Sequence, residues 1–296
     1  MKCGMSINLS IADIHLEISL DRPVKITDNF KPFLDAASEP DYKVECTKMD
    51  VLPSVRGEML ANESDYSVWK NAGKFIRCFY DRKNQSRVYA LTSLDVERKS
   101  LLVQYLPEGK EFFSDTGNCF FHLMWEKLLI QEQRMIFHAA CIDTEWGGVL
   151  FSGPSGIGKS TQADLWCKYR RAQLLNGDRT ILYNDEDEWY AYGSPYAGSS
   201  RCYVNECCRV RAIVILSKDR CCRLRHVRAA EAFQKIYSGM TVNSWDMDFV
   251  EKICDMINDL IKNVAVYELH CTPDKDAVEI LQEELKKGES EWNQRK

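Results

Sequence analysis

The chain has 296 residues, which is enough for one large domain or for two ordinary domains with their own hydrophobic cores. Apolar residues make up 45% of the chain and charged residues 28%, a balance that is typical of a soluble globular protein. The formal net charge of −5 at pH 7 argues against nucleic acid as the main partner.

The first third of the chain contains short stretches in which apolar and polar residues alternate, and these stretches predict β-strands. We expect strands at residues 7–20, 67–80, 87–94 and 101–106, with a polar turn at 81–85. The segment 29–53 contains Pro32, Pro40 and Pro53, which predict irregular structure because proline cannot donate to a strand ladder. Residues 1–114 are therefore expected to form a β-rich N-terminal domain that selects the substrate or mediates assembly.

A domain boundary is predicted at residues 114–118, where a short polar sequence interrupts the apolar pattern. Beyond it, apolar residues recur at helical spacing. This spacing predicts one continuous helix, capped by Asp115 or Thr116, that ends near Arg134.

Strands and helices alternate through the rest of the chain. Strands are expected at residues 137–142, 148–152, 174–175, 181–183, 189–192, 211–216 and 264–269, and helices at 160–170, 229–238 and 248–261. A last helix is expected to have Thr272 as its cap, Pro273 at its first position and Gly288 just past its end. This order predicts that residues 115–296 form a single α/β domain.

A phosphate loop follows the predicted buried strand at 148–152. Its residues fit the pattern G-x-x-x-x-G-K-[ST] at every fixed position: Gly153, Pro154, Ser155, Gly156, Ile157, Gly158, Lys159 and Ser160, with Thr161 next. In such a loop the glycines let backbone N–H groups surround phosphates, at the N-terminus of the helix that follows. Lys159 would reach the β- and γ-phosphates and the Ser160 hydroxyl would contact Mg²⁺, so we predict that the chain binds a nucleoside triphosphate.

Asp178 is a candidate for the chemical step. It lies nineteen positions after Lys159, at the end of the short apolar strand predicted at 174–175. A carboxylate in this place can hold Mg²⁺, or it can orient and deprotonate an acceptor hydroxyl. The loop 192–200 follows, and its glycines, proline and hydroxyls would allow a ligand to approach the backbone closely.

Four segments occur in a characteristic order: Phe137-His138-Ala139-Ala140, the phosphate loop, Asn176-Gly177-Asp178-Arg179 and Tyr192-Gly193-Ser194-Pro195. With them the chain resembles the HPr kinase and ATP-type phosphoenolpyruvate carboxykinase superfamily, and most of all its short kinase-like members found beside peptide-modification genes in bacteria. The resemblance covers residues 137–285 and implies an HPr kinase-like, phosphate-loop nucleotide-binding domain of the α/β class. Self-association is a further implication, because HPr kinases form oligomers.

The resemblance also implies roles for single residues. His138 would approach the transferred phosphoryl group, and Asp178 would lie near Mg²⁺ and the acceptor. HPr kinases commonly carry two adjacent acids at this position, whereas here Gly177 and Arg179 flank a single one. Arg179 would either stabilise charge in the transition state or pair with the acidic turn at 185–188.

These observations predict an ATP- and Mg²⁺-dependent kinase that transfers the γ-phosphoryl group to a hydroxyl. The acceptor is expected to be a Ser or Thr of a peptide or small protein, and a small molecule such as a free amino acid is the alternative. A nucleotide-binding regulator that transfers nothing is a second class. We expect a cytoplasmic protein without a membrane partner, because the start of the chain lacks a signal segment and its longest apolar run, 212–216, is too short for a bilayer.

Overall fold

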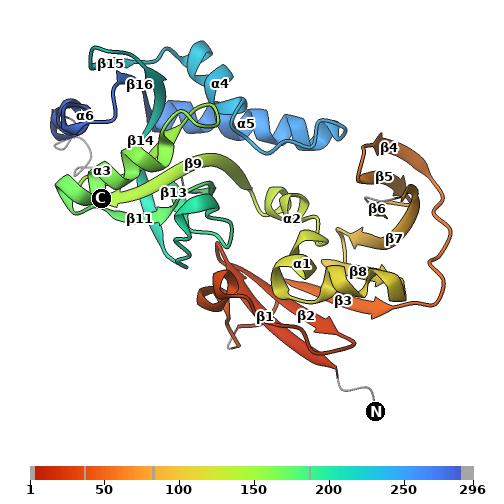
Figure 1. Cartoon of the computed structure of the whole chain (residues 1–296). Coiled ribbons are helices and arrows are strands. Elements are labelled where there is room, and N and C mark those ends of the chain that lie inside the picture. The colour runs from red at the N-terminus through yellow and green to blue at the C-terminus, as the bar shows by residue number, and fades with distance from the viewer. Residues whose placement is uncertain (1–3, 37, 82–83, 187, 288–296) are drawn as a thin grey trace. The chain divides into compact units, whose positions relative to one another are not determined.

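The computed structural model describes residues 4–36, 38–81, 84–186 and 188–287 (Figure 1). The chain divides into two compact units, Met1–Leu128 and Leu129–Lys296, and the division falls within the helix α2 (Trp125–Gln131). Each unit is built on its own large sheet, so the protein is of the mixed α/β class. Among the described residues, no helix is both long enough and apolar enough to cross a membrane.

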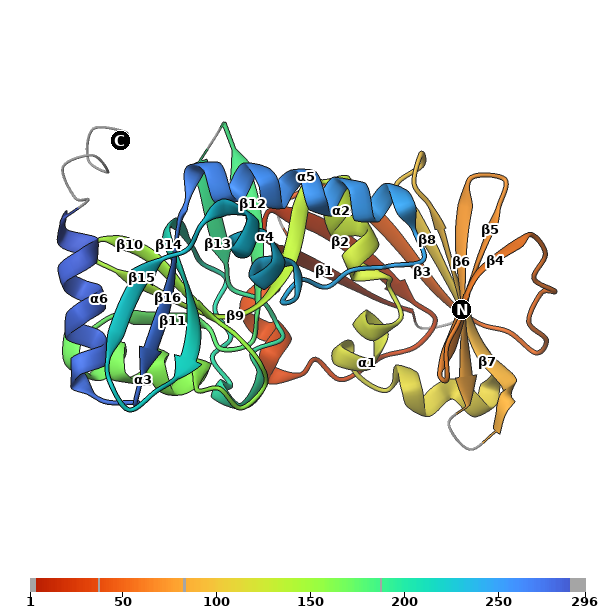
Figure 2. The same ribbon diagram turned by 90° about the horizontal axis from the view of Figure 1, so that it is seen from above.

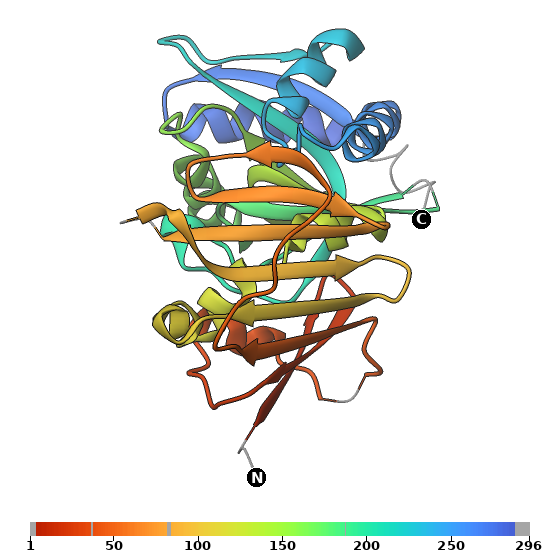
Figure 3. The same cartoon turned by 90° about the vertical axis from the view of Figure 1, so that its right-hand side faces the viewer.

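The first unit contains an eight-stranded sheet in the order β1-β2-β3-β8-β7-β6-β5-β4 (Figure 3). Its strands are β1 (Met5–Ile11), β2 (Ile14–Leu20), β3 (Tyr42–Lys48), β4 (Glu58–Asn62), β5 (Tyr66–Asn71), β6 (Lys74–Asp81), β7 (Asn84–Asp95) and β8 (Ser100–Tyr105). The 3₁₀ helices η1 (Asp28–Phe33) and η2 (Pro107–Phe113) belong to the same unit. Most pairings are antiparallel, but β3 runs parallel to both β2 and β8.

Two of the predicted strands are in fact hairpins. Residues 7–20 contain β1 and β2, joined at Ala12 and Asp13, which both have positive φ angles of 50° and 59°. Residues 67–80 contain β5 and β6, joined by a tight turn at Ala72 and Gly73. Two central residues with positive φ give the turn whose twist matches that of the flanking antiparallel strands. The predicted turn at 81–85 lies partly outside the described residues.

The prediction of irregular structure at 29–53 is wrong, because β3 lies inside this segment. In β3, Tyr42, Val44 and Cys46 are buried in alternation with exposed residues, the pattern of a strand with one face in the core. The prolines do not interrupt this strand. Pro32 lies in η1, and Pro40 and Pro53 lie on either side of β3, where no ladder hydrogen bond is required.

The single helix predicted after residue 115 is also wrong. The segment forms two short helices, α1 (Thr116–Phe121) and α2, and Met124 between them has a φ of +54° that no α-helix permits. The predicted cap is present, because the Asp115 carboxylate accepts a hydrogen bond of 2.9 Å from the Asn118 amide. Arg134, the predicted end of the helix, instead begins the strand β9 (Arg134–Thr144).

The second unit contains a sheet in the order β10-β9-β12-β13-β14-β16-β15, in which β10 also pairs with β14 and β11 pairs with β9. Its further strands are β10 (Gly147–Ser152), β11 (Gln173–Asn176), β12 (Arg179–Asp185), β13 (Glu188–Tyr192), β14 (Cys207–Lys218), β15 (Arg223–His226) and β16 (Ala265–Cys271). Its helices are α3 (Lys159–Arg170), η3 (Gly198–Ser200), α4 (Ala229–Tyr237), α5 (Met247–Asn263) and α6 (Lys275–Lys287). Because β10, β14 and β16 run parallel, their carboxyl ends meet at one edge of the sheet.

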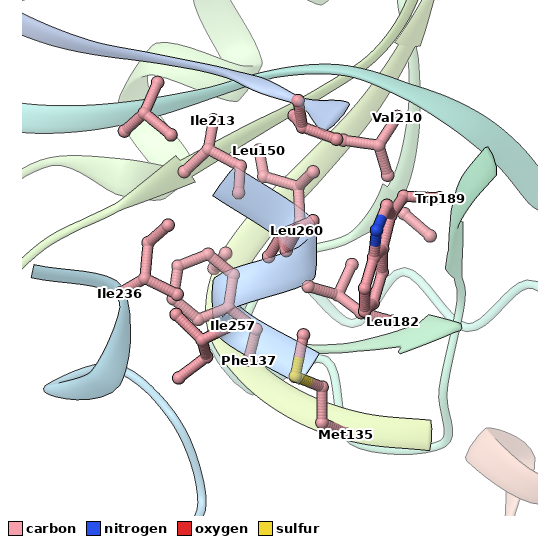
Figure 4. Close-up of a cluster of buried hydrophobic side chains, with 14 of the residues drawn as sticks. Met135, Phe137, Leu150, Leu182, Trp189, Val210, Ile213, Ile236, Ile257 and Leu260 are labelled. Atoms are coloured by element: carbon pink, nitrogen blue, oxygen red, sulfur yellow. The ribbon is translucent and has the colours of Figure 1, made fainter. Parts of the chain in front are cut away.

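Helices cover both faces of this second sheet. Leu150, Ile213 and Ile257 lie in the apolar cluster that the sheet forms with α4 and α5 (Figure 4). On the opposite face, Phe151 and Val214 pack with residues of α3 and α6. Figure 2 shows α5 along one face of the strands and α3 along the other. Neighbouring residues of β10 thus enter different cores, which explains why its sequence is apolar without interruption.

The last helix begins later than predicted. Asp274 accepts a hydrogen bond of 3.3 Å from the Ala277 amide, so this carboxylate fills the capping role expected of Thr272, and Pro273 lies before the helix. Gly288, predicted just past its end, lies outside the described residues. The strand β15 has no counterpart in the prediction, because only one of its four residues, Leu224, is apolar.

Candidate functional site

The phosphate loop connects β10 to α3, as the sequence predicts. Gly153, Gly156 and Gly158 have φ angles of 145°, 73° and 116°, which residues with a Cβ rarely adopt. Lys159 is the first residue of α3, so the unpaired amide groups and the positive end of this helix face the loop. Strand, loop and helix therefore have the arrangement in which a phosphate group can bind.

Lys159 is held over the loop. Its side chain is buried, and Nζ donates hydrogen bonds of 3.1 Å to the Gly153 carbonyl and 3.4 Å to the Pro154 carbonyl. Burial lowers the pKa of Lys159, and the nearby carboxylate of Asp178 opposes this shift. The ammonium group is therefore held by two backbone carbonyls of the loop.

Asp178 lies in the turn between β11 and β12, and it contacts His138 from the neighbouring strand β9. His138 Nε2 is 2.8 Å from Asp178 Oδ1, and Arg179 Nε is 3.9 Å from Asp178 Oδ2. The pairing of β9 with β12 sets this contact, because His138 and Arg179 are directly opposite each other. The side chain of Asp178 is 31% exposed and that of His138 is 45% exposed, so both groups can reach a ligand.

Asn176 fixes the turn that carries Asp178. Its side-chain oxygen accepts hydrogen bonds of 2.8 Å from the amides of both Asp178 and Arg179. Its side-chain nitrogen donates to the Ser194 hydroxyl at 3.1 Å and to the Tyr196 carbonyl at 3.2 Å. The completely buried amide thus joins the Asp178 turn to the loop that follows β13.

The same loop touches Asp178 at Gly198. A Cβ added to Gly198 would lie 2.9 Å from the Cβ of Asp178, and the φ of Gly198 is +56°. Ser194 also donates a hydrogen bond of 2.7 Å from its hydroxyl to the Arg179 carbonyl. The loop 192–200, predicted to approach a ligand, therefore packs against the Asp178 turn and supports it. Nothing in the sequence singled out Asn176 or Ser194 for this supporting role.

A cavity of about 740 Å³ lies beside the phosphate loop. It is lined by residues of the loop and α3 and by the ends of β14 and β16, including Gly158, Gln162, Lys218, Arg220, Cys271 and Pro273. Sequence reasoning missed this cavity. The signal was available, because ligands of α/β sheets bind at the carboxyl ends of parallel strands, and 211–216 and 264–269 were both predicted as strands.

Gln162 is a buried polar residue at the wall of this cavity. Its Nε2 donates a hydrogen bond of 3.3 Å to Cys271 Sγ, and its Oε1 makes no hydrogen bond to any residue that the structure describes. Buried polar atoms are normally paired, so an acceptor left over beside a cavity is suited to a donor group on a ligand.

The predicted site residues therefore lie within one unit. His138, Lys159, Asp178 and Arg179 lie near one another through the contacts given above, and Ser160 and Thr161 follow Lys159 in the first turn of α3. The hydroxyl of Ser160 and the carboxylate of Asp178 are oxygen donors of the kind that Mg²⁺ prefers. The residues present fit such an ion.

Comparison with known proteins adds little to this geometry. No protein-family model matches the chain, and no curated protein matches it. Among solved structures, the chain is similar to the Hpr(Ser) kinase/phosphatase from Coxiella burnetii, with a TM-score of 0.32 and 13% sequence identity over 54% of this chain and 96% of that one.

Proposed function

We propose that the chain is an ATP- and Mg²⁺-dependent kinase that transfers the γ-phosphoryl group to a hydroxyl, most suitably that of a Ser or Thr in a peptide or small protein. One observation carries this proposal. A complete phosphate loop, with its lysine already positioned, lies beside a carboxylate that a histidine contacts at 2.8 Å. Phosphoryl transfer depends mainly on positioning and charge stabilisation, and this set of groups supplies both.

Binding of the nucleotide begins at the loop. The backbone amides of 153–160 and the start of α3 would surround the phosphates, and Lys159 would exchange its two carbonyl contacts for phosphate oxygens. This exchange is favourable because a phosphate carries full negative charge, whereas a carbonyl carries only a dipole. The nucleoside end would enter the cavity beside the loop, where Gln162 offers an unused acceptor.

Ser160 and Asp178 would hold the metal. When bound there, Mg²⁺ would neutralise the negative charge that develops on the phosphate oxygens as the γ-phosphoryl group departs. Asp178 then has a second role, since its carboxylate can accept the proton of the attacking hydroxyl. His138, at 2.8 Å from Oδ1, would fix the orientation of this carboxylate, and Arg179 would add positive charge on its other side.

The first unit would contribute to selection of the acceptor. Its large sheet carries none of the groups named above, so we assign to the N-terminal domain a role in binding the acceptor or in assembly of a homo-oligomer. The alternative acceptor is a small molecule with a hydroxyl group, and the experiment below distinguishes the two classes.

The test is transfer of label from γ-labelled ATP, with Mg²⁺, to free serine, free threonine and a pool of Ser- and Thr-containing peptides. We expect label on an acceptor with the wild-type chain, and a loss of about a hundredfold or more in rate with Lys159→Ala and with Asp178→Asn. Asp164→Asn is the matched control, because Asp164 is an exposed residue of α3 and its substitution should leave the rate unchanged.

If the protein binds ATP but labels no acceptor, the result would favour the non-transferring regulator. Wild-type activity retained in Asp178→Asn would remove the assigned role of this carboxylate.

A further inference from the structure

Cys222 lies one residue before the strand β15, and Cys271 is the last residue of the neighbouring strand β16. These strands are antiparallel, and their register pairs Arg223 with His270 and Leu224 with Leu269. The register ends at the pair Arg223 and His270, and if continued by one residue it would set Cys222 opposite Cys271. Neither cysteine forms a disulfide in the structure.

Both side chains lie on the same face of the sheet. Leu224 and Leu269 belong to the apolar cluster that packs against α3 and α6, and Cys222 and Cys271 belong to it as well. This is the result that the alternation of a strand requires, since residues two apart share a face. The two thiols therefore point in the same direction from adjacent strands.

The spacing of such a pair suits a disulfide. Residues directly opposite in an antiparallel ladder have Cα atoms roughly 4.5–5.5 Å apart, and a disulfide accepts Cα separations of roughly 4.4–6.8 Å. Only a small approach of the two Cβ atoms is then needed, because opposite Cβ atoms are about 4.5–5.5 Å apart and a disulfide prefers about 3.8 Å. The pair lies at the end of the ladder, where β15 begins, so the backbone can supply this movement.

The pair also adjoins the cavity beside the phosphate loop. Cys271 lines the cavity together with Asp219 and Arg220, which lie in the segment that leads to Cys222. The Asp219 amide donates a hydrogen bond of 3.3 Å to the Cys271 carbonyl, and Gln162 Nε2 donates to Cys271 Sγ. A bond between the two cysteines would draw Sγ of Cys271 away from Gln162 and pull the cavity-lining segment toward β16.

We propose that Cys222 and Cys271 are a modification site, a dithiol that forms a reversible disulfide and thereby opposes binding of a ligand in the cavity. We infer the disulfide from the strand register alone. Its effect on nucleotide binding rests on the proposed function.

The reaction is exchange with a small disulfide such as oxidised glutathione. Cys222 is the more exposed of the two and attacks first, as its thiolate, on one sulfur of glutathione disulfide. This step forms a mixed disulfide and releases one glutathione thiolate. The thiolate of Cys271 then attacks the sulfur of Cys222 and displaces the second glutathione. The two protons lost by the protein thiols go to the two glutathione molecules, so one disulfide is consumed and one is formed.

The experiment equilibrates the full chain in buffers of reduced and oxidised glutathione, blocks the remaining thiols and maps disulfide-linked peptides by mass spectrometry. We expect a link between the peptides that contain Cys222 and Cys271 in the wild-type chain. Cys221→Ser is the matched control, because Cys221 is the exposed neighbour and lies one residue off the register, and this variant should keep the link. Cys222→Ser and Cys271→Ser should abolish it. No link in the wild-type chain, or a link that persists in Cys222→Ser through Cys221, overturns the proposed site.

The coupling to the cavity is measured in the same buffers with and without Mg²⁺ and ATP. If the nucleotide binds the dithiol form better, the quotient [GSH]²/[GSSG] at half-oxidation falls by at least about fivefold when ATP is present, because coupling between two sites is reciprocal. ATP that binds, by an independent binding measurement, without moving this quotient refutes the coupling. A chain that does not bind ATP refutes the proposed function instead, and the peptide link still decides whether the disulfide forms.

Discussion

Asn176 shows how a buried polar residue can determine the place of a reactive one. Its amide group is completely buried, and it bonds to the backbone of the Asp178 turn with its oxygen and to the loop of Ser194 and Tyr196 with its nitrogen. Because Asn176 is completely buried and its oxygen and nitrogen both bond to neighbouring segments of the chain, it acts on the site by positioning Asp178. It does not itself contact a substrate.

Asn176→Ala should therefore affect stability and catalysis together. The change removes the hydrogen bonds that the Asn176 side chain makes to the amides of Asp178 and Arg179 and to the loop that follows β13, each worth about 0.5–1.5 kcal/mol, so we expect a loss of roughly 2–4 kcal/mol in the free energy of unfolding. Chemical denaturation measures this loss. In the label-transfer assay kcat should fall while KM for ATP changes little, because Asn176 makes no contact with the phosphate loop in the bonds described.

The control for this prediction is Asn205→Ala, since Asn205 is exposed in the segment before β14. It should change neither stability nor rate. An Asn176→Ala protein with wild-type kcat would contradict the positioning role, even if its stability fell as expected.

At the scale of elements, a cluster of charges fixes β15 and α4 to β16. Glu268 of β16 is buried and accepts hydrogen bonds from Arg225 of β15 and, at 2.9 Å, from Lys235 of α4. Burial alone would raise the pKa of Glu268, but the hydrogen bonds from Lys235 and Arg225 outweigh it and hold the pKa below its usual value of 4.5. Both cations would lose a buried partner if the carboxylate were removed.

Glu268→Gln should therefore destabilise the protein at neutral pH by about 1–3 kcal/mol, the worth of hydrogen bonds between charged groups. The sign of the pH dependence follows from the lowered pKa. A carboxyl group with a lowered folded-state pKa contributes stability above its unfolded pKa and loses this contribution as pH falls through the folded one. Denaturation curves of the two proteins should thus converge as pH falls below 4.5.

Glu283→Gln is the matched control, because Glu283 is exposed on α6. It should follow the wild-type protein at every pH. A gap between wild type and Glu268→Gln that stays constant down to pH 3 would show that the carboxylate charge contributes nothing to this cluster.

The sequence predicted some elements well, and it failed where no local signal marked the structure. The strand, phosphate loop and helix at 148–170 carry a motif and an apolar pattern that agree, so their prediction held. The turn at Ala12 and Asp13 contains no glycine or proline, so nothing in the sequence divided 7–20 into a hairpin. Met124 likewise breaks a helix that its own propensity favours, because tertiary packing overrides propensity.

The candidate site was predictable only in part, for a physical reason. A motif fixes the phosphate loop because its residues are adjacent in the sequence. The approach of His138 to Asp178 depends on the pairing of β9 with β12, which no local pattern encodes. Asn176, Ser194 and the cavity at the ends of β14 and β16 likewise depend on which strands become neighbours.

At the scale of the whole molecule, the chain is two units with separate sheets. Their division at Leu128 and Leu129 falls after the boundary that the sequence suggested at 114–118. All of the residues to which we assign nucleotide binding and transfer belong to the second unit. Binding of ATP at the phosphate loop of this unit is therefore the step on which the proposed phosphoryl transfer depends.

Hydrogen exchange of the full chain, with and without Mg²⁺ and ATP, tests this claim most directly. We expect slower exchange at the amides of 153, 155–162 and 176–179 in the presence of nucleotide, because these backbone groups would bond to phosphate or be held by the ligand around Asp178. The slowing should disappear in Lys159→Ala and persist in Asp164→Asn. Equal exchange at the phosphate loop with and without saturating ATP would contradict the account.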